Sequence, residues 1–159
     1  MSALDHNAFM REAAELAHEN VTSGRGGPFG AVIVREGCIV GRGTNLVTSS
    51  NDPTAHAEVV AIRNACRELG TFNLAGSQVY TSCEPCPMCL AAIYWARLDK
   101  IYFANTRQDA ARIGFDDDQI YQEVSLPLDQ RSTPIQCLPC DEALATFELW
   151  TTKSDKVPY

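Results

Sequence analysis

The sequence predicts an α/β fold in which one mixed sheet of about five strands lies between two layers of helices, a three-layer α/β/α sandwich. Three observations favour this fold. Short apolar runs alternate with amphipathic segments along the chain. Two of these runs are separated only by a Glu36-Gly37 turn, as in a hairpin. Further along, a strand-like, a helix-like and a strand-like segment follow one another, which favours a right-handed crossover between parallel strands.

The first part of the chain is expected to contain a helix, a hairpin and a second helix. Over 7–20, apolar residues recur at helical spacing with charged residues between them, which predicts an amphipathic helix. The glycine-rich segment 23–28 lacks the Lys-Ser/Thr ending of a P-loop, so we interpret it as a flexible rim beside a pocket. Apolar runs at 29–35 and 38–40 predict the two strands of the hairpin. The next helix, 54–69, is apolar almost all round, which indicates that it is packed between layers.

The second part of the chain supplies the crossover and the C-terminal elements. With 159 residues and no internal linker or repeat, the sequence is expected to form one domain, 1–159. The expected segments are, in order, a buried strand at 79–81, an apolar helix at 86–97, a strand at 101–104, a short helix at 106–114, an acidic loop at 115–118, a last strand at 135–138, a helix at 141–151 and a polar tail at 153–159.

The composition excludes several classes of protein. A net charge of -7 opposes binding to a phosphate backbone, and no local basic patch compensates for it. No apolar run approaches the roughly 18 residues that a membrane helix requires. The N-terminal sequence lacks the features of a signal peptide, and the odd number of cysteines, seven, suits a reducing compartment. We therefore expect a cytoplasmic protein that binds neither nucleic acid nor membranes.

Two short stretches carry the residues for chemistry. One places His56 and Glu58 two residues apart, and the other places Cys86 and Cys89 three apart after Pro85. His-x-Glu followed by Pro-Cys-x-x-Cys is the signature of zinc-dependent nucleobase deaminases. A catalytic zinc takes three protein ligands and leaves a fourth position for water, and one histidine with two thiolates satisfies that count. Both sets are expected at helix N-termini, where the helix dipole favours thiolates.

Glu58 is expected to move protons without binding the metal. It would take a proton from the attacking water and return it to the ring nitrogen and the leaving amine, a contribution of roughly 10²–10⁴-fold. A histidine alone would more often be a packed or capping residue. The combination of His56 with Glu58 and the paired cysteines is what favours the catalytic interpretation.

A structural metal site is the alternative that these cysteines leave open. Cys83 and Cys86 together with Cys137 and Cys140 would form a closed four-cysteine zinc site without catalysis. This binding module would leave the histidine, the glutamate and Cys89 without a role. It would also require a distant part of the chain to supply two of the ligands.

Over nearly its whole length the chain resembles the cytidine-deaminase-like superfamily, and within it the small bacterial guanine deaminases. The motifs that carry this resemblance, beyond the zinc signature, are Gly27-Pro28-Phe29-Gly30-Ala31, Asn51-Asp52-Pro53-Thr54-Ala55-His56-Ala57-Glu58, Ala92-Ile93-Tyr94-Trp95-Ala96-Arg97, Gly114-Phe115-Asp116-Asp117 and the terminal Tyr159. The acidic loop has a third aspartate, Asp118, which leaves open which carboxylate enters the pocket.

The resemblance implies a cofactor, a set of site residues and an assembly. One zinc ion per subunit would be bound by His56, Cys86 and Cys89, with Glu58 as the proton shuttle. Asp117 would recognise the departing amine and assist its protonation. The implied purine pocket consists of Phe29, Asn45, Ala57, Trp95, Asp117 and Tyr159. The implied assembly is a homodimer in which the tail 153–159 is exchanged, so that Tyr159 closes the partner's site.

The function expected from these features is hydrolytic deamination of guanine to xanthine and ammonia, a step of purine catabolism. Asn45 and a carboxylate can pair with the amine and amide edges of guanine, and unpaired polar groups would exclude other bases by up to roughly 10⁴-fold. Deamination of cytosine, guanosine or an aminotriazine on the same zinc site is the nearest alternative. A tRNA adenosine deaminase is disfavoured by the acidic charge.

Overall fold

The chain forms two compact units. The computed structural model describes residues 5–115 and 117–159. The first unit is Met1–Asp118 and the second is Gln119–Tyr159. Whether the two units make up a single domain, 1–159, stays a prediction. Among the described residues, no helix combines the length and the apolar character that crossing a bilayer requires.

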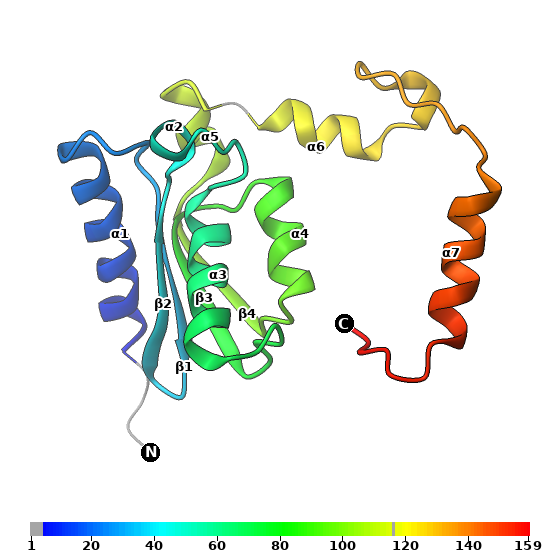
Figure 1. Ribbon diagram of the computed structural model, residues 1–159. Helices are drawn as coiled ribbons and strands as arrows, with labels where there is room; N and C mark the ends of the chain where they lie inside the picture. Colours follow the sequence, from blue (N-terminus) through cyan, green and yellow to red (C-terminus); the bar gives the residue numbers. More distant parts are fainter. Residues whose placement is uncertain (1–4, 116) are drawn as a thin grey trace. The chain divides into compact units, whose positions relative to one another are not determined.

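The first unit is built on one mixed sheet (Figure 1). Its described strands are β1 (Gly30–Arg35), β2 (Cys38–Thr44), β3 (Ser77–Cys83) and β4 (Lys100–Asn105), in the order β2-β1-β3-β4. β1 is antiparallel to β2 and β3, which confirms the predicted hairpin. β3 and β4 are parallel, as the strand-helix-strand pattern predicts.

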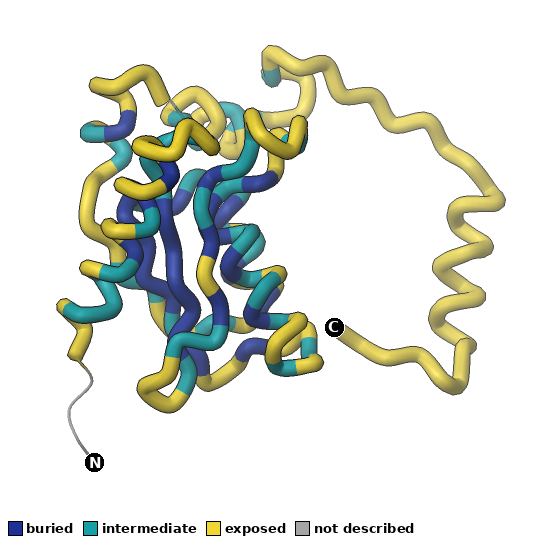
Figure 2. The backbone as a smooth tube through the Cα atoms, turned by 60° about the vertical axis from the view of Figure 1, so that its left-hand side comes forward, coloured by how far each residue is buried: buried dark blue, intermediate teal, exposed yellow. Residues whose placement is uncertain are grey.

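Helices cover both faces of this sheet (Figure 1). α1 (His6–Thr22) lies on one face, and α3 (Ala57–Leu69) and α4 (Pro87–Trp95) lie on the other. Successive residues of β1 point to opposite faces, so Ala31 and Ile33 pack with α3 while Val32 and Val34 pack beneath α1. The three-layer α/β/α fold is therefore confirmed, and its interior is the buried part of Figure 2.

The predicted fifth strand is wrong. Residues 135–138 form no strand, and the sheet has four strands among the described residues. Pro134 and Pro139 bracket this segment. Proline has no backbone N–H to donate to a sheet ladder, so little strand-forming backbone remains between the two.

Two helices begin later than the sequence predicts. α3 begins at Ala57 and not at Thr54, because the Asp52 side chain accepts hydrogen bonds from the Thr54 backbone N–H at 2.8 Å and from the Thr54 hydroxyl at 2.6 Å. This Asx turn holds the chain outside the helical conformation. α4 begins at Pro87, which suits the first helical position, so Cys86 becomes its N-cap.

The remaining helices of the first unit are short. α5 (Arg107–Arg112) was predicted within 106–114, and Thr106 caps it in a capping box with Asp109. α2 (Val47–Ser50) has four residues and was not predicted.

The second unit consists mainly of helices. α6 (Asp118–Ser125), which begins at the last residue of the first unit, was not predicted. The 3-10 helix η1 (Leu128–Gln130) follows, and α7 (Asp141–Thr152) confirms the predicted final helix. Nearly all of the second unit is exposed (Figure 2). Its exposed large apolar side chains are Ile120, Val124, Leu128, Ile135, Leu138, Leu144, Phe147, Leu149, Trp150, Val157 and Tyr159.

Close backbone contact fixes α3 against β2. A Cβ atom on Gly43 would lie 2.1 Å from the carbonyl oxygen of Ala57, and one on Gly41 would lie 2.5 Å from that of Ala61. Only glycine permits this approach. Ala57 and Ala61 are fully buried in the contact. The first turn of α3, which follows His56, is thereby held directly on the sheet.

Candidate metal and substrate site

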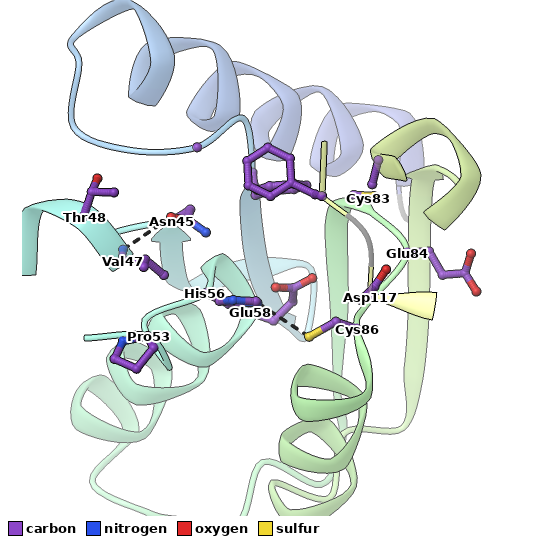
Figure 3. A pocket seen from close by; sticks show the side chains of 14 residues that line it. Asn45, Val47, Thr48, Pro53, His56, Glu58, Cys83, Glu84, Cys86 and Asp117 are labelled. Atoms are coloured by element: carbon purple, nitrogen blue, oxygen red, sulfur yellow. Dashed lines mark hydrogen bonds between the residues drawn. The ribbon is translucent and has the colours of Figure 1, made fainter. Parts of the chain in front are cut away.

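A cavity of about 330 Å³ lies in the first unit, beside the N-termini of α3 and α4 (Figure 3). His56 and Glu58 reach it from the start of α3, and Cys86 reaches it from the start of α4. The other residues that line it are Gly27, Phe29, Asn45, Val47, Thr48, Pro53, Cys83, Glu84, Ala110, Phe115 and Asp117. The two motifs of the sequence therefore meet in one cavity.

Three potential metal ligands converge at this cavity. Nδ1 of His56 lies 3.5 Å from Sγ of Cys86 and 3.6 Å from Sγ of Cys89. With bond lengths of about 2.3 Å for Zn–S and about 2.0 Å for Zn–N, tetrahedral geometry separates N and S ligands by ~3.5 Å. These spacings therefore fit a zinc site with His56 bound through Nδ1. All three ligand atoms lie within 4.8 Å of one another.

The backbone explains why these side chains converge. His56 and Cys86 are both N-cap residues in extended conformation, and Cys89 follows in the first turn of α4. Neither N-cap side chain accepts a capping hydrogen bond, so both are available to a metal. Two positive helix ends therefore face the same point, which favours the anionic forms of the cysteines.

The hydrogen bonds among the three ligands shift their pKa values. The hydrogen bond from Cys89 and, after it, the bond to His56 lower the pKa of Cys86 to about 4 against the opposing effect of burial. The bond to Cys86 and burial raise the pKa of Cys89. The bond to Cys86 also raises the pKa of His56. The lowered pKa of Cys86 favours its thiolate, which is the form in which cysteine binds zinc.

Glu58 lies beside this group and does not belong to it. Its side chain is 6% exposed and lines the cavity, and its Oε1 accepts a hydrogen bond of 2.8 Å from the Thr81 hydroxyl. Burial is the main reason that the pKa of Glu58 is raised. A carboxyl group with a raised pKa that faces a cavity suits general acid-base chemistry.

The opposite wall of the cavity is aromatic and polar. The rings of Phe29 and Phe115 meet edge to face, with centroids 4.8 Å apart. Asn45 is buried, and its Oδ1 accepts a hydrogen bond of 3.3 Å from the Val47 N–H. Asn20 of α1 is fully buried and donates through Nδ2 to the carbonyl oxygens of Asn45, at 2.8 Å, and Gly27, at 2.9 Å. α1 therefore holds two loops of this wall in place.

Comparison with known proteins identifies the family. Residues 4–105 match the family described as "Cytidine and deoxycytidylate deaminase zinc-binding region". The chain belongs to this family. Together with the fit of the three ligands, the match establishes this deaminase as a zinc protein.

Three similar proteins show how far the likeness extends. This deaminase is 50% identical to guanine deaminase of Bacillus subtilis (strain 168) over 156 residues, which cover 98% of this chain and 100% of that protein. The X-ray structure of guanine deaminase from Bacillus subtilis superposes on this chain with a TM-score of 0.95 at 50% identity. The superposition covers 98% of this chain and 99% of the chain in that structure. A tRNA-specific adenosine deaminase of Haemophilus influenzae is 33% identical over 144 residues, 87% of this chain and 80% of that protein.

Most of the predicted site residues of this deaminase lie at the cavity. Phe29, Asn45, Glu58 and Asp117 line it together with His56 and Cys86, and buried Cys89 completes the metal group. Asp117 is half-buried, and burial is the main reason that its pKa is raised. Asp118 is exposed at the start of α6 and does not line the cavity, while Asp116 lies outside the described residues.

Two predicted pocket residues of the first unit do not line this cavity, and a third lies in the second unit. Ala57 is buried against the sheet, where its carbonyl oxygen faces Gly43. Trp95 ends α4 and is 63% exposed, with the Arg97 guanidinium 6.0 Å from its ring centroid. Tyr159 belongs to the second unit and is 74% exposed. Their roles in binding a substrate stay predictions.

Several residues of the site were not predicted. Glu84 lines the cavity and its Oε2 accepts a hydrogen bond of 3.0 Å from the Arg107 N–H at the start of α5. Phe115 was part of a quoted motif but was not assigned to the pocket. Cys83 also lines the cavity, and burial raises the pKa of its thiol to about 11. Cys83 ends β3, three residues before Cys86 of the zinc motif. This position in the sequence is the signal that could have placed Cys83 and Glu84 at the cavity.

The structure groups Cys86 with His56 and Cys89, and not with the ligands that a four-cysteine site requires within the first unit. Within residues 5–115 and 117–159, the group of histidine, cysteine and carboxylate side chains close enough to share a metal is that of His56, Cys86 and Cys89. The Cys83 thiol instead lies 3.7 Å from the Thr106 carbonyl oxygen. Cys137 and Cys140 are exposed in the second unit.

Proposed function

We propose that this chain catalyses the hydrolytic deamination of guanine to xanthine and ammonia. The observation that carries the proposal is the convergence of a zinc-binding group and a buried glutamate in one cavity of a chain that is half identical to guanine deaminase along 98% of its length. The substrate is a small nucleobase. A net charge of -7 disfavours a phosphate-bearing substrate such as tRNA.

His56, Cys86 and Cys89 would hold one zinc ion per chain. When bound, zinc lowers the pKa of a coordinated water from about 9 toward about 7 and so supplies the nucleophile at neutral pH. In the overall reaction the water oxygen forms a bond to the ring carbon that carries the amine. The bond from that carbon to nitrogen breaks, and the amine leaves as ammonia.

Glu58 moves the protons of this reaction. Its carboxylate accepts a proton from the attacking water and passes it to the neighbouring ring nitrogen. It then takes the second proton of the same oxygen, as the new carbonyl forms, and delivers it to the leaving amine. Burial favours the protonated form, so the proton is retained between these transfers. Asp117, on the same cavity, recognises the departing amine and assists its protonation.

The wall opposite Glu58 binds and orients the ring. The edge-to-face pair of Phe29 and Phe115 provides an apolar surface for a flat base. The Asn45 amide pairs with the polar edge of guanine. A base that leaves Asn45 or Asp117 unpaired loses affinity, because buried polar groups without partners are costly.

We further propose a homodimer in which the C-terminal segment is exchanged between copies and Tyr159 closes the partner's cavity. The second unit supports this proposal, because it exposes many large apolar side chains and apolar patches of that kind mark interaction surfaces. Tyr94 and Trp95 of α4 are also largely exposed and would take part in the dimer. A lid would strengthen each polar contact to the ring by excluding water.

An ammonia-release assay on the zinc-loaded protein tests the proposed reaction. Guanine should be deaminated with a kcat/KM at least about a hundredfold above those of guanosine, cytosine, adenine and an aminotriazine. If the protein prefers one of these compounds to guanine, that compound is the substrate, and the proposed zinc chemistry still applies. We also propose a cytoplasmic location, which fits the seven cysteines and is tested by fractionation of cells that express the protein.

A further inference from the structure

The Thr81 hydroxyl is buried on the face of β3 that packs beneath α3. Val79 of this strand belongs to the core cluster beneath α3, and Thr81, two residues later, lies on the same face. Thr81 is 1% exposed. An aliphatic side chain would pack there at no polar cost, so packing does not explain the hydroxyl.

The partner of this hydroxyl is the proposed proton-transfer residue. The Thr81 Oγ1 donates to Oε1 of Glu58 over 2.8 Å, and both side chains are buried. The bond joins the central strand β3 to the first turn of α3, 23 residues away in sequence.

Glu58 needs such a bond to hold a single orientation. Three side-chain torsions separate its carboxylate from the backbone, and the last of them has a broad, nearly two-fold energy profile. A Cys89 that ligates zinc is a thiolate and cannot donate a hydrogen bond to the carboxylate. The Thr81 hydroxyl is a neutral donor and can hold it.

We propose that Thr81 is a positioning residue for proton transfer. Its hydroxyl fixes Oε1 of Glu58, so that Oε2 is the oxygen presented to the water and the base in the cavity. This inference rests on the proposed function of Glu58. Loss of the bond lets the carboxylate rotate away from the reacting atoms, which lowers the rate of the chemical step more than it weakens substrate binding.

Variants with and without the hydroxyl test the role of Thr81. Thr81→Val replaces the hydroxyl with a methyl group at nearly equal size, and Thr81→Ser keeps the hydroxyl. Thr81→Val should retain stoichiometric zinc and a KM for guanine within about threefold, while kcat falls by about tenfold or more. Thr81→Ser should restore most of kcat. Should Thr81→Val fail to fold, Thr81→Ala and Thr81→Ser differ by the same single oxygen and should show the same difference in kcat.

A neighbouring hydroxyl supplies the control. Tyr80 of the same strand points to the opposite face, where its hydroxyl lies 2.6 Å from Nδ1 of His6 and donates to Gln78 over 3.0 Å. Tyr80→Phe removes a β3 hydroxyl that does not reach the cavity. Its kcat and KM should stay within about twofold of the unaltered protein.

The Glu58→Gln background separates the two proposals. If Thr81 acts through Glu58, adding Thr81→Val to Glu58→Gln should lower kcat by less than about twofold. Full activity of Glu58→Gln would refute the role of Glu58 itself. An impaired Glu58→Gln with an unimpaired Thr81→Val would overturn the positioning role alone. Equal kcat losses in Thr81→Val and Thr81→Ser, or loss of zinc in both, would assign Thr81 to folding and overturn it as well.

Discussion

At the scale of single residues, the environment separates Glu58 from the metal ligands. His56, Cys86 and Cys89 contact one another through nitrogen and sulfur, whereas the Glu58 carboxylate is bonded to Thr81 and faces the cavity. Proximity alone would make any of the four side chains a candidate ligand. The set of partners supports our proposal that three of them bind the metal and one transfers protons.

Replacing Glu58 tests that assignment. Glu58→Gln keeps the size of the side chain and removes its ability to accept and release a proton. Zinc content should stay near one per chain, while kcat should fall by at least about a hundredfold. Metal analysis and steady-state kinetics on the same preparation measure both. His56→Ala should lose zinc and turnover together, and loss of zinc in Glu58→Gln would show that the glutamate is a ligand.

Asp117 is the second residue whose role can be measured. Asp117→Asn should lower kcat/KM for guanine by about tenfold or more, because the amide cannot transfer a proton to the departing amine. The melting temperature should change little, since Asp117 is only half-buried. Asp118→Asn serves as the control because Asp118 is exposed and away from the cavity lining. A larger loss in Asp118→Asn or Asp116→Asn would move the role to that residue.

The metal group could be predicted from the sequence because its spacing is local. Cys86 and Cys89 are three residues apart at the start of a helix, and His56 and Glu58 are two residues apart. Two short segments therefore suffice to predict the metal ligands and the proton carrier. Thr81 could not be identified in this way. Its importance depends on which face of β3 it occupies and on the register that brings α3 over that face.

At the scale of elements, backbone packing places the site. α3 lies so close to β2 that no side chain fits at Gly43, against its first turn, or at Gly41, one turn further along. His56 precedes this turn and Glu58 belongs to it. Gly41 and Gly43 of β2 thus determine the position of α3. The position of α3 in turn determines where His56, a proposed ligand, and Glu58, the proposed proton carrier, lie.

Gly43→Ala tests this contact. The added methyl group would meet the backbone of Ala57 and Ala61, so α3 must shift, and overpacking of this kind costs about 1–3 kcal/mol. At about 2–4 °C per kcal/mol for a protein of this size, the melting temperature should fall by several degrees. Zinc affinity and kcat should fall too, because the shift includes the N-terminus of α3.

Gly41→Ala is the matched control one turn further along α3. Its methyl group would also meet helix backbone, so the melting temperature should fall by a similar amount. The disturbed turn lies further from His56, so zinc affinity should fall less than in Gly43→Ala. Equal zinc affinities in the two variants would contradict a specific role of the Gly43 contact in placing the site.

Element boundaries show where prediction from sequence reaches its limit. The pattern of apolar residues in the sequence located α1, the hairpin, α3, α4 and α7. It placed the start of α3 too early, since the Asx turn at Asp52 competes with the helix. It predicted a strand at 135–138 where two prolines remove the hydrogen bonds that a strand requires.

At the scale of the whole molecule, the two units differ in how they bury apolar side chains. The first has a packed interior on both faces of its sheet. The second leaves Phe147 and Leu149 of α7 largely exposed. A helix with this composition is seldom stable without a partner surface, and the proposed exchange between copies would provide one.

Deletion of residues 156–159 tests the closing role of the tail. Zinc content and dimer mass should remain, because the deleted residues include neither a ligand nor α7. Guanine turnover should fall by about tenfold or more, because water is no longer excluded from the ring. Analytical ultracentrifugation, metal analysis and kinetics provide the readouts, and full activity of the shortened protein would exclude the lid.

Mixing two impaired proteins shows whose cavity the tail closes. The shortened chain has an intact site without a tail, and full-length Glu58→Gln has a tail with an impaired site. If the tail closes the partner's cavity, dimers that contain one chain of each kind should regain activity, up to about one working site per dimer. If the tail closes its own cavity, mixing restores nothing.

The unequal construction of the two cavity walls has a consequence for engineering new substrate preferences. On the Glu58 side, main-chain atoms touch across Gly43 and Ala57, so side-chain exchange there disturbs the catalytic group before it reshapes the pocket. On the other side, Phe29, Asn45 and Phe115 line the cavity with their side chains, and Asn20 holds the backbone at Gly27 and Asn45 from behind. Libraries that vary these three positions and keep Asn20 can explore other amino-substituted rings while the reaction chemistry stays constant.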